Sequence, residues 1–428
     1  MQSHLSAETV LVALALFTGI LAGTGAYLLR LMVKGVAHPV TASFSAVSAN
    51  WQLLFLPVLA IVLAGIFQRY VIRRNLYHGV DRMRAALASR NYRLPFSLTF
   101  TPLFANAITL GLGGSAGSEG PIAYAGGAIG SNLGRVFGLD SDRMRVMIAC
   151  GASAGIAGIF KAPIGGALFS LEVLCLDLSM VAVVAVLVAS LSAGLTSFML
   201  SGCSPDVEFA HQVPMEVSWL PWLLLLGLFC GFYSLYYATV MSRMSNFYGR
   251  LRNPWIRNLL AGTLLAVMVF LFPTLYGEGY GFIELVLDGK AAAVTADSLF
   301  AGAASTWEIL LIFGGILAVK AFAVASTNSG GGVAGDFAPT LFAGCLAGYF
   351  FATLVNALFH CGMPPADFAF FGMAAVMAAA IRAPLMAIIL TVEIAQTYML
   401  LFPVVVVATV SYCVVRAIHP QPAPVPRS

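Results

Sequence analysis

Two acidic residues stand at glycine-rich junctions within otherwise apolar sequence. Glu119 lies in GGSAGSEGPIAYAGG, residues 113–127, and Asp336 lies in GGGVAGDFAP, residues 330–339. An ionisable residue buried among apolar membrane segments is a functional candidate by default. The six histidines form no HxxxH or HExxH pattern and the seven cysteines form no CxxC pair. The sequence therefore predicts neither a metal site nor a redox-active dithiol, and no cofactor is expected.

Both acids stand where helices could begin. Ser118-Glu119-Gly120-Pro121 and Gly335-Asp336-Phe337-Ala338-Pro339 each place a proline at or near a first helical turn, where its missing N–H costs nothing. A helix that begins in a low-dielectric surrounding presents unpaired N–H groups and about half a positive charge, which makes an anion site without lysine or arginine. Partial charges also let the ion leave again. The sequence therefore predicts an anion rather than a cation as the substrate.

Glu119 can compete with such an anion. When ionised, its carboxylate mimics the anion and blocks the pathway. When protonated, it loses its hold on the N–H groups and swings away. This chemistry would make Glu119 a gate, a proton carrier or both. The alternative is an acid that complements a helix dipole at the membrane edge, as Asp and Glu often do.

The composition places these junctions in a membrane. The chain has 428 residues, of which 60% are hydrophobic and 9% are charged, whereas a soluble domain is about a quarter charged. The expected fold class is an all-α polytopic membrane protein. Apolar stretches long enough to span a bilayer recur at 8–30, 51–67, 179–200, 219–240, 258–273, 308–326, 338–358 and 400–416.

The net charge of +4 is concentrated in two short arginine clusters. Seven arginines lie between Gln68 and Arg93, and four lie between Arg243 and Arg257. The positive-inside rule explains both clusters by placing them in the cytoplasm, so no nucleic-acid partner is expected. The expected partners are membrane lipid and small inorganic anions.

An internal repeat organises the chain. The segment KAPIGGALFSLE at 161–172 returns as RAPLMAIILTVE at 382–393, and PIAYAGGAIG at 121–130 returns as PTLFAGCLAG at 339–348. The offsets are 221 and 218 positions, and the blocks keep their order. The expected units are an N-terminal region with a first membrane span (1–49), a first transmembrane repeat (50–205), a linker (206–224), a second transmembrane repeat (225–416) and a short C-terminal tail (417–428).

Short helices within the repeats indicate a transporter. Segments 121–136 and 163–178 have 16 residues each, which reach about 24 Å, whereas the bilayer core is about 30 Å thick. Segments interrupted by glycine and proline at corresponding places in two halves indicate a substrate site built from broken helices.

Four motifs, in order over about residues 50 to 415, carry a family resemblance: GSEGP with GGAIG, GASAGIAGIFKAPIGGALFSLE, GGVAGDFAPTLFAG and AAIRAPLMAIILTVE. They resemble the CLC family of chloride channels and proton/chloride antiporters. The resemblance implies an inverted-repeat fold of tilted and broken helices, and a homodimer with one anion pore per subunit. It implies that Glu119 is the external gating glutamate. Backbone N–H groups at Asp336 and Phe337 would hold the central anion, and those around Ser118 and Gly120 the outer one.

Several positions depart from the family pattern. The family motif Gly-Ser-Gly-Ile-Pro aligns with Tyr77-His78-Gly79-Val80-Asp81, so the resemblance places His78 where a serine hydroxyl contacts the central anion. A histidine could donate an N–H to the anion and titrate near neutral pH; the alternative is a loop histidine at the membrane interface. Ser118 replaces the usual arginine. The family's C-terminal tyrosine has no counterpart, since its position falls within 421–424.

Three further positions bear on the function. The internal proton-accepting glutamate of the antiporters aligns with Val173, while Glu172 aligns with a neighbouring acid that we expect to be structural. Asp336 stands at a usually apolar position. We expect its N–H to bind the anion while its side chain points elsewhere or caps the helix; a second gate is the alternative.

These observations favour transport of a small inorganic anion, with chloride as the bound substrate, through a passive channel gated by protonation of Glu119. The alternative is a proton-coupled antiporter for chloride, another halide or nitrate, which the retained Glu119 favours. No serine–histidine, metal or paired-acid pattern supports a membrane-embedded enzyme. The size of the chain indicates a multi-pass protein of a bacterial inner membrane.

Overall fold

The protein is described from a computed structural model that covers residues 7–42, 44, 50–73, 76, 79–89, 92–176, 179–203, 215–295, 298–300, 302 and 305–420. These residues form α-helices and no β-strand. The helices are α1 (Ala7–Thr41), α2 (Leu56–Ile66), α3 (Gly79–Ala88), α4 (Thr101–Gly111), α5 (Glu119–Val136), α6 (Ser141–Phe160), α7 (Pro163–Leu168), α8 (Met180–Leu200), α9 (Leu220–Arg250), α10 (Pro254–Leu271), α11 (Tyr280–Leu287), α12 (Thr306–Gly330), α13 (Phe337–Phe359), α14 (Pro365–Ile381), α15 (Pro384–Ile394) and α16 (Leu401–Ile418).

Within this described part of the chain, nine helical segments are long and apolar enough to cross a membrane. Eight of them coincide with the stretches expected from the sequence, although three expected stretches, 179–200, 258–273 and 400–416, extend one or two residues beyond the helix. The ninth, α6, was not expected because it is rich in glycine, alanine and serine, which give a weak apolar signal. Its small residues suit its position, since most of α6 is buried among other helices instead of facing lipid. The expectation of a polytopic, all-α membrane protein is confirmed.

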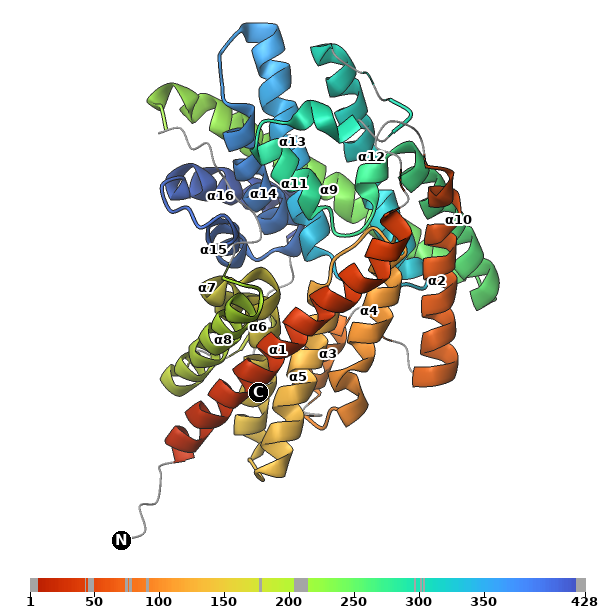
Figure 1. The fold of residues 1–428 in the computed structure, drawn as a ribbon. Helices are drawn as coiled ribbons and strands as arrows, with labels where there is room; N and C mark the ends of the chain where they lie inside the picture. The colour runs from red at the N-terminus through yellow and green to blue at the C-terminus, as the bar shows by residue number, and fades with distance from the viewer. Residues whose placement is uncertain are drawn as a thin grey trace.

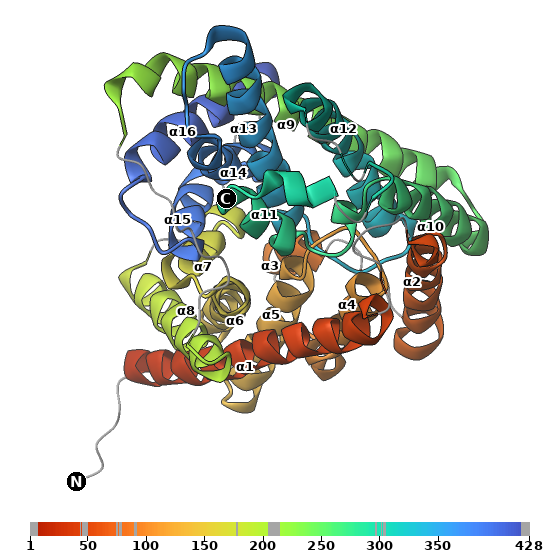
Figure 2. The ribbon, with the colours of Figure 1, turned by 45° about the horizontal axis from the view of Figure 1, so that its top comes forward.

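The two halves of the chain occupy two sides of the molecule. In Figure 1 the red-to-yellow helices of the first half lie below the green-to-blue helices of the second half. Figure 2 shows α1 running along the first half, where it packs against α4, α5, α6 and α8. The helices α5 and α13 begin near the centre of the molecule and run outward in different directions.

Equivalent helix pairs pack in the same way in both halves. A Cβ atom on Gly126 of α5 would lie 2.0 Å from the carbonyl oxygen of Gly151 on α6. A Cβ atom on Gly344 of α13 would lie 2.2 Å from the carbonyl oxygen of Gly372 on α14. Only glycine permits this backbone approach. The two pairs are related by the offsets of 218 and 221 positions found in the sequence, so the repeat also appears in three dimensions.

Each glycine-rich junction is a non-helical segment between two helices. The first separates the end of α4 from the start of α5, and the second separates the end of α12 from the start of α13. The junctions bind one another: Gly117 N–H donates to the Gly335 carbonyl oxygen at 2.9 Å, and Gly335 N–H donates to the Gly117 carbonyl oxygen at 2.7 Å. These residues are 218 positions apart, so this mutual pair lies on the axis that relates the two repeats.

A second reciprocal exchange fixes the junctions. The hydroxyl of Thr109 in α4 accepts a hydrogen bond from Val333 N–H at 3.1 Å. The hydroxyl of Thr327 in α12 accepts one from Ser115 N–H at 3.0 Å. Each helix thereby satisfies a buried backbone donor in the junction of the other repeat, which matters because lipid offers no replacement partner.

A third exchange joins α7 to α15. The Glu172 carboxylate accepts hydrogen bonds from the first N–H groups of α15, with Met386 N–H at 2.7 Å. The Glu393 carboxylate accepts the equivalent bonds from α7, with Gly165 N–H at 2.7 Å. Glu172 lies in the π-helical turn Phe169–Val173 that follows α7, and Glu393 lies in the last turn of α15. Each acid serves the orphan N–H groups at the start of the opposite helix. This is the structural role expected for Glu172, and the repeated motif that ends in glutamate has a physical cause.

Candidate anion site

Glu119 begins α5, but its side chain binds the first turn of α13. Its Oε1 accepts a hydrogen bond from Ala338 N–H at 2.7 Å. The side chain is buried, and its Oε2 has no hydrogen-bond partner among the described residues. A Cβ atom on Gly117 would lie 2.1 Å from Oε2, and one on Gly335 would lie 2.6 Å from it. The glycines of both junctions therefore leave the space that this carboxylate fills.

Ser118 lies beside Glu119 and is held by two neighbours. Its hydroxyl donates to Oδ1 of Asn106 at 2.9 Å, and its backbone N–H donates to Oε1 of Glu278 at 3.1 Å. The expected outer anion donor at this position is thus already bound to a carboxylate. Glu278 was missed in the sequence because it is 160 positions away, although its setting between glycines in YGEGY repeats that of GSEGP.

Asp336 and Phe337 stand at the start of α13. Asp336 makes no capping hydrogen bond to this helix, so the capping expected as one option is not found. Its side chain instead accepts a hydrogen bond from Nδ2 of Asn328 at 2.5 Å. The ring of Phe337 is buried and meets the edge of Phe169, with 5.8 Å between ring centroids.

A cavity of about 190 Å³ opens beside these helix starts. Gly120, Asp336 and Phe337 all line it, so the structure brings together three of the residues predicted for the anion site. Its lining joins the starts of α3, α5 and α13 to the end of α14: Gly79, Val80, Asp81, Arg84, Gly120, Val173, Asn328, Ala334, Gly335, Asp336, Phe337, Ala380 and Ile381.

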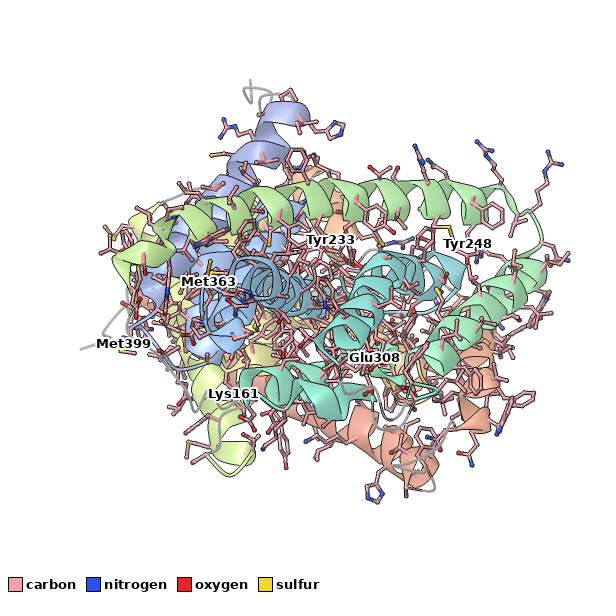
Figure 3. All side chains as sticks on the ribbon, turned by 90° about the horizontal axis from the view of Figure 1, so that it is seen from above. Lys161, Tyr233, Tyr248, Glu308, Met363 and Met399 are labelled. Atoms are coloured by element: carbon pink, nitrogen blue, oxygen red, sulfur yellow. The ribbon has the colours of Figure 1, made fainter. Side chains whose placement is uncertain are left out.

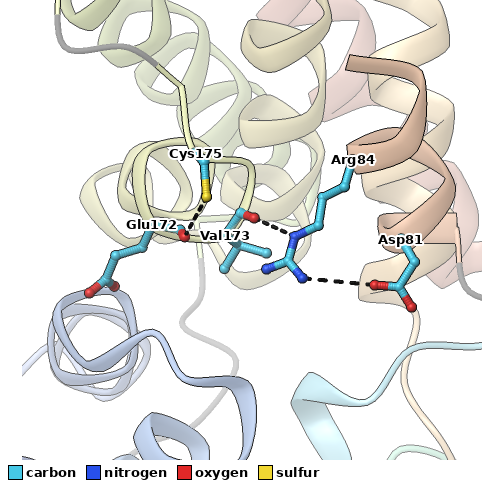
Figure 4. Close-up of polar contacts among 5 residues, drawn as sticks. All are labelled: Asp81, Arg84, Glu172, Val173 and Cys175. Atoms are coloured by element: carbon cyan, nitrogen blue, oxygen red, sulfur yellow. Dashed lines mark hydrogen bonds and ion pairs between the residues drawn. The ribbon is translucent and has the colours of Figure 1, made fainter. Parts of the chain in front are cut away.

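Arg84 is the basic residue that faces this cavity. Its Nε donates to the carbonyl oxygen of Val173 at 2.5 Å, and its guanidinium lies 3.8 Å from the Asp81 carboxylate. Figure 4 shows Arg84 between these two partners, while the Glu172 side chain points away from Val173 toward another helix. The position aligned with a proton-accepting glutamate in the antiporters is therefore an apolar, buried valine bound through its backbone.

Lys320 adds a buried positive charge behind the first junction. It is fully buried in α12, and its Nζ donates to the Ser115 hydroxyl at 3.0 Å. The Nζ atom also lies 4.3 Å above the ring of Phe342, a favourable cation–π position. Lys320 interacts electrostatically with Glu119. A lone lysine within the apolar stretch 308–326 was the signal that could have found it.

Tyr237 brings a hydroxyl from α9. The residue is buried, and its hydroxyl has no hydrogen-bond partner among the described residues. Asp336 and Glu119 are charged groups in its neighbourhood. Tyr233, one turn earlier, differs because its hydroxyl donates to the Leu317 carbonyl oxygen at 3.0 Å. Figure 3 shows Tyr233 and Tyr248 on the side of α9 that faces the other helices.

Two parts of the sequence prediction lie outside the described residues. His78, expected at the central anion, is one of them, and so is the segment 421–424 that aligns with the family's C-terminal tyrosine. For the described residues, no group of three His, Cys, Asp or Glu side chains lies close enough to hold a metal ion.

Chemically, the arrangement suits an anion that competes with carboxylates. Two helix N-termini from opposite repeats meet at the junctions, and each presents N–H groups with partial positive charge. Three carboxylates lie around them: Glu119 binds Ala338 N–H, Glu278 binds Ser118 N–H, and Asp336 directly precedes the first turn of α13. The amine of Lys320 is buried behind the first junction.

Comparison with known proteins identifies the family and the fold. Residues 60–416 match the family model described as voltage gated chloride channel. A chloride channel protein named ClcB-like from Ralstonia nicotianae is 27% identical over 373 residues, covering 86% of this chain and 83% of that protein. An H(+)/Cl(-) exchange transporter ClcA from Vibrio vulnificus is 27% identical over 419 residues, covering 94% of this chain and 86% of that protein.

Two solved structures share the fold. A slow cyanobacterial Cl-/H+ antiporter superposes with a TM-score of 0.80 at 22% identity, covering 96% of this chain and 95% of that one. A CLC-type fluoride/proton antiporter superposes with a TM-score of 0.77 at 23% identity, covering 96% of each chain. The expected inverted repeat of tilted and broken helices is thereby confirmed.

Proposed function

The chain belongs to the voltage gated chloride channel family, and from this membership and the geometry of the site we propose that it exchanges a small inorganic anion, chloride in the first place, for protons. The observation that carries the proposal is the 2.7 Å hydrogen bond from Ala338 N–H to Glu119 Oε1. A carboxylate from one repeat occupies the first turn of a broken helix from the other, where a permeating anion would bind.

Competition for the same donors couples the two ions. An ionised Glu119 holds the start of α13 and excludes the anion. When Glu119 takes up a proton, it loses the charge that binds it to the N–H groups, and an anion replaces it. Loss of the proton restores the carboxylate, which displaces the anion. Alternating occupancy of one set of donors therefore links anion movement to proton movement.

The central anion would take its donors from two helices. The Phe337 N–H lies in the first turn of α13, where backbone donors have no acceptor within the helix. The Tyr237 hydroxyl is a second donor, because a buried hydroxyl without a partner is destabilising by about 1–3 kcal/mol. An anion between these donors satisfies both. We assign Asp336 a backbone contact with the anion, with its side chain facing the cavity.

Exchange is proposed in preference to passive conduction because the Vibrio vulnificus relative is named an exchange transporter and both solved structures are antiporters. The sequence by itself favoured a channel. A passive channel is the second candidate function, and the presence of Val173 at the position of the antiporters' internal glutamate favours it. Its side chain cannot carry a proton, and its carbonyl oxygen is bound by Arg84.

We also propose a homodimer in the inner membrane of a bacterial cell. The relatives named above come from bacteria, and homodimers are what the family resemblance implies. The half-exposed side chains of Ile164 and Leu385, at the starts of α7 and α15, give this side of the molecule an apolar surface that a second copy could cover. Light scattering of the detergent-solubilised protein would give the subunit count.

Purified protein in liposomes tests the exchange directly. A chloride gradient is imposed, and the external pH is followed without buffer. The proposal expects chloride moving down its gradient to drive protons against theirs. Chloride flux without proton movement would overturn exchange and leave the channel. Replacing chloride with fluoride, bromide and nitrate in the same assay would establish the preferred anion.

A further inference from the structure

Glu278 lies at the start of α5 although it belongs to the loop that precedes α11. Its Oε1 accepts a hydrogen bond from Ser118 N–H at 3.1 Å. The loop is tied to the first junction through its preceding residue, since Gly277 N–H donates to the Gly114 carbonyl oxygen at 2.9 Å. The carboxylate is therefore delivered to the helix start by a fixed backbone.

The glycines on both sides of Glu278 fix that delivery. Gly277 and Gly279 have φ values of 70° and 86°, in the left-handed region that favours glycine. A Cβ atom on Gly279 would also lie 2.4 Å from the ring of Phe342. The turn can hardly adopt another shape without moving this ring, so the position of Glu278 is specified by the fold.

A carboxylate binds the start of each of the two opposed helices, α5 and α13, and in both cases it comes from a residue outside that helix. Glu119 is the first residue of α5, but its carboxylate binds Ala338 N–H in α13. The carboxylate of Glu278 binds the start of α5 by accepting a hydrogen bond from Ser118 N–H. Because Ser118 and Glu119 are adjacent, the two carboxylates belong to one site, and Glu119 retains an oxygen without a partner among the described residues. The site thus holds two side-chain anions where the backbone offers two anion positions.

We propose that Glu278 is a second gating carboxylate, which occupies at the start of α5 the place that a small inorganic anion takes during transport. This inference rests on the proposed anion transport but does not require proton coupling. An incoming anion or a proton releases Glu278 from Ser118 N–H, and the anion then binds there. The charged groups near this position are Glu119, next to Ser118 on α5, and Lys320 on α12, which reaches Ser115; Asp336, at the start of α13, lies near Glu119.

A purely structural role makes a different prediction. A side chain that only caps a helix contributes to stability and has no effect on ion binding. Glu278→Gln separates the two roles, because the amide oxygen can still accept the hydrogen bond from Ser118 N–H while the negative charge is gone. A gating role predicts a change in anion affinity; a capping role predicts none.

The experiment measures chloride binding by calorimetry and chloride efflux from liposomes between pH 5 and pH 8. We expect Glu278→Gln to bind chloride about tenfold more tightly, because a competing charge is removed. We expect its efflux to depend less on pH than that of the wild type, with an unchanged unfolding temperature. The double variant with Glu119→Gln should lose the pH dependence that remains in Glu119→Gln alone.

The matched control is Glu308→Gln. Glu308 lies in the capping box of α12 with Ser305, on the exposed start of that helix, and its neutralisation should leave chloride affinity and the pH profile unchanged. Equal chloride affinity and equal pH profiles in Glu278→Gln and the wild type would reduce Glu278 to a helix cap. A wild type without proton movement would overturn exchange, yet a tighter chloride affinity in Glu278→Gln would still support this gate.

Discussion

Glu172 and Glu393 occupy equivalent positions in the two repeats: Glu172, which follows α7, binds the first turn of α15, and Glu393, in the last turn of α15, binds the first turn of α7. The four hydrogen bonds involved have nearly the same lengths in both directions, 3.1 and 2.7 Å for Glu172 and 3.0 and 2.7 Å for Glu393. No α-helix can satisfy its own first N–H groups, so α7 and α15 each need an acceptor from outside the helix. The two repeats therefore depend on each other for stability.

Removing either carboxylate should destabilise the protein to a similar extent. We expect Glu172→Ala and Glu393→Ala each to lower the free energy of unfolding by about 1–2 kcal/mol, because the first N–H groups of the opposite helix lose a charged acceptor. Thermal unfolding in detergent measures the effect, and Glu8→Ala on the exposed first turn of α1 is the control. A large loss for only one of the two acids would contradict the symmetric arrangement.

Neutralising Glu119 should separate anion movement from proton movement. In Glu119→Gln the side chain keeps its size but no longer competes as an anion for Ala338 N–H. We expect proton uptake to vanish, and chloride flux to lose most of its rise toward acidic pH, since no carboxylate remains there to be protonated. Paired pH-electrode and chloride-electrode recordings check this. Chloride flux that rises with acidity as in the wild type would rule out gating by Glu119.

Removing the Tyr237 hydroxyl should weaken anion binding. Tyr237→Phe keeps the ring in place and deletes only the unpartnered hydroxyl, so we expect chloride affinity to fall about tenfold by calorimetry, as for one hydrogen bond to a charged group. Tyr233→Phe on the same helix is the matched control, because its hydroxyl binds the Leu317 carbonyl oxygen. If both variants bind chloride like the wild type, Tyr237 is not an anion ligand.

Arg84 should attract anions into the cavity. Without its charge, the carboxylates of Asp81 and Asp336 remain on the lining and would repel an incoming anion. We expect Arg84→Gln to reduce chloride flux, most strongly at low ionic strength, where charges are screened least. Arg84→Lys keeps the charge and should retain most of the flux. A loss that does not depend on salt would point to the bond with Val173 instead.

Local sequence was enough to locate the two junctions and the residues at them. Glycine, proline and an acid within apolar sequence have few other physical explanations, which is why Glu119 and Asp336 could be found. Glu278 and Tyr237 could not, because they reach the site through the packing of distant segments. The span α6 was missed for a related reason: its small residues record contact with other helices and not with lipid.

The mutual hydrogen bonds between Gly117 and Gly335 join the two halves of the chain at the glycine-rich junctions. A transport cycle in which one half moved against the other would have to break both of these backbone hydrogen bonds. We therefore expect the backbone of the two junctions to stay fixed while ions pass. The movement during transport would then be confined to side chains, namely the carboxylates of Glu119 and Glu278.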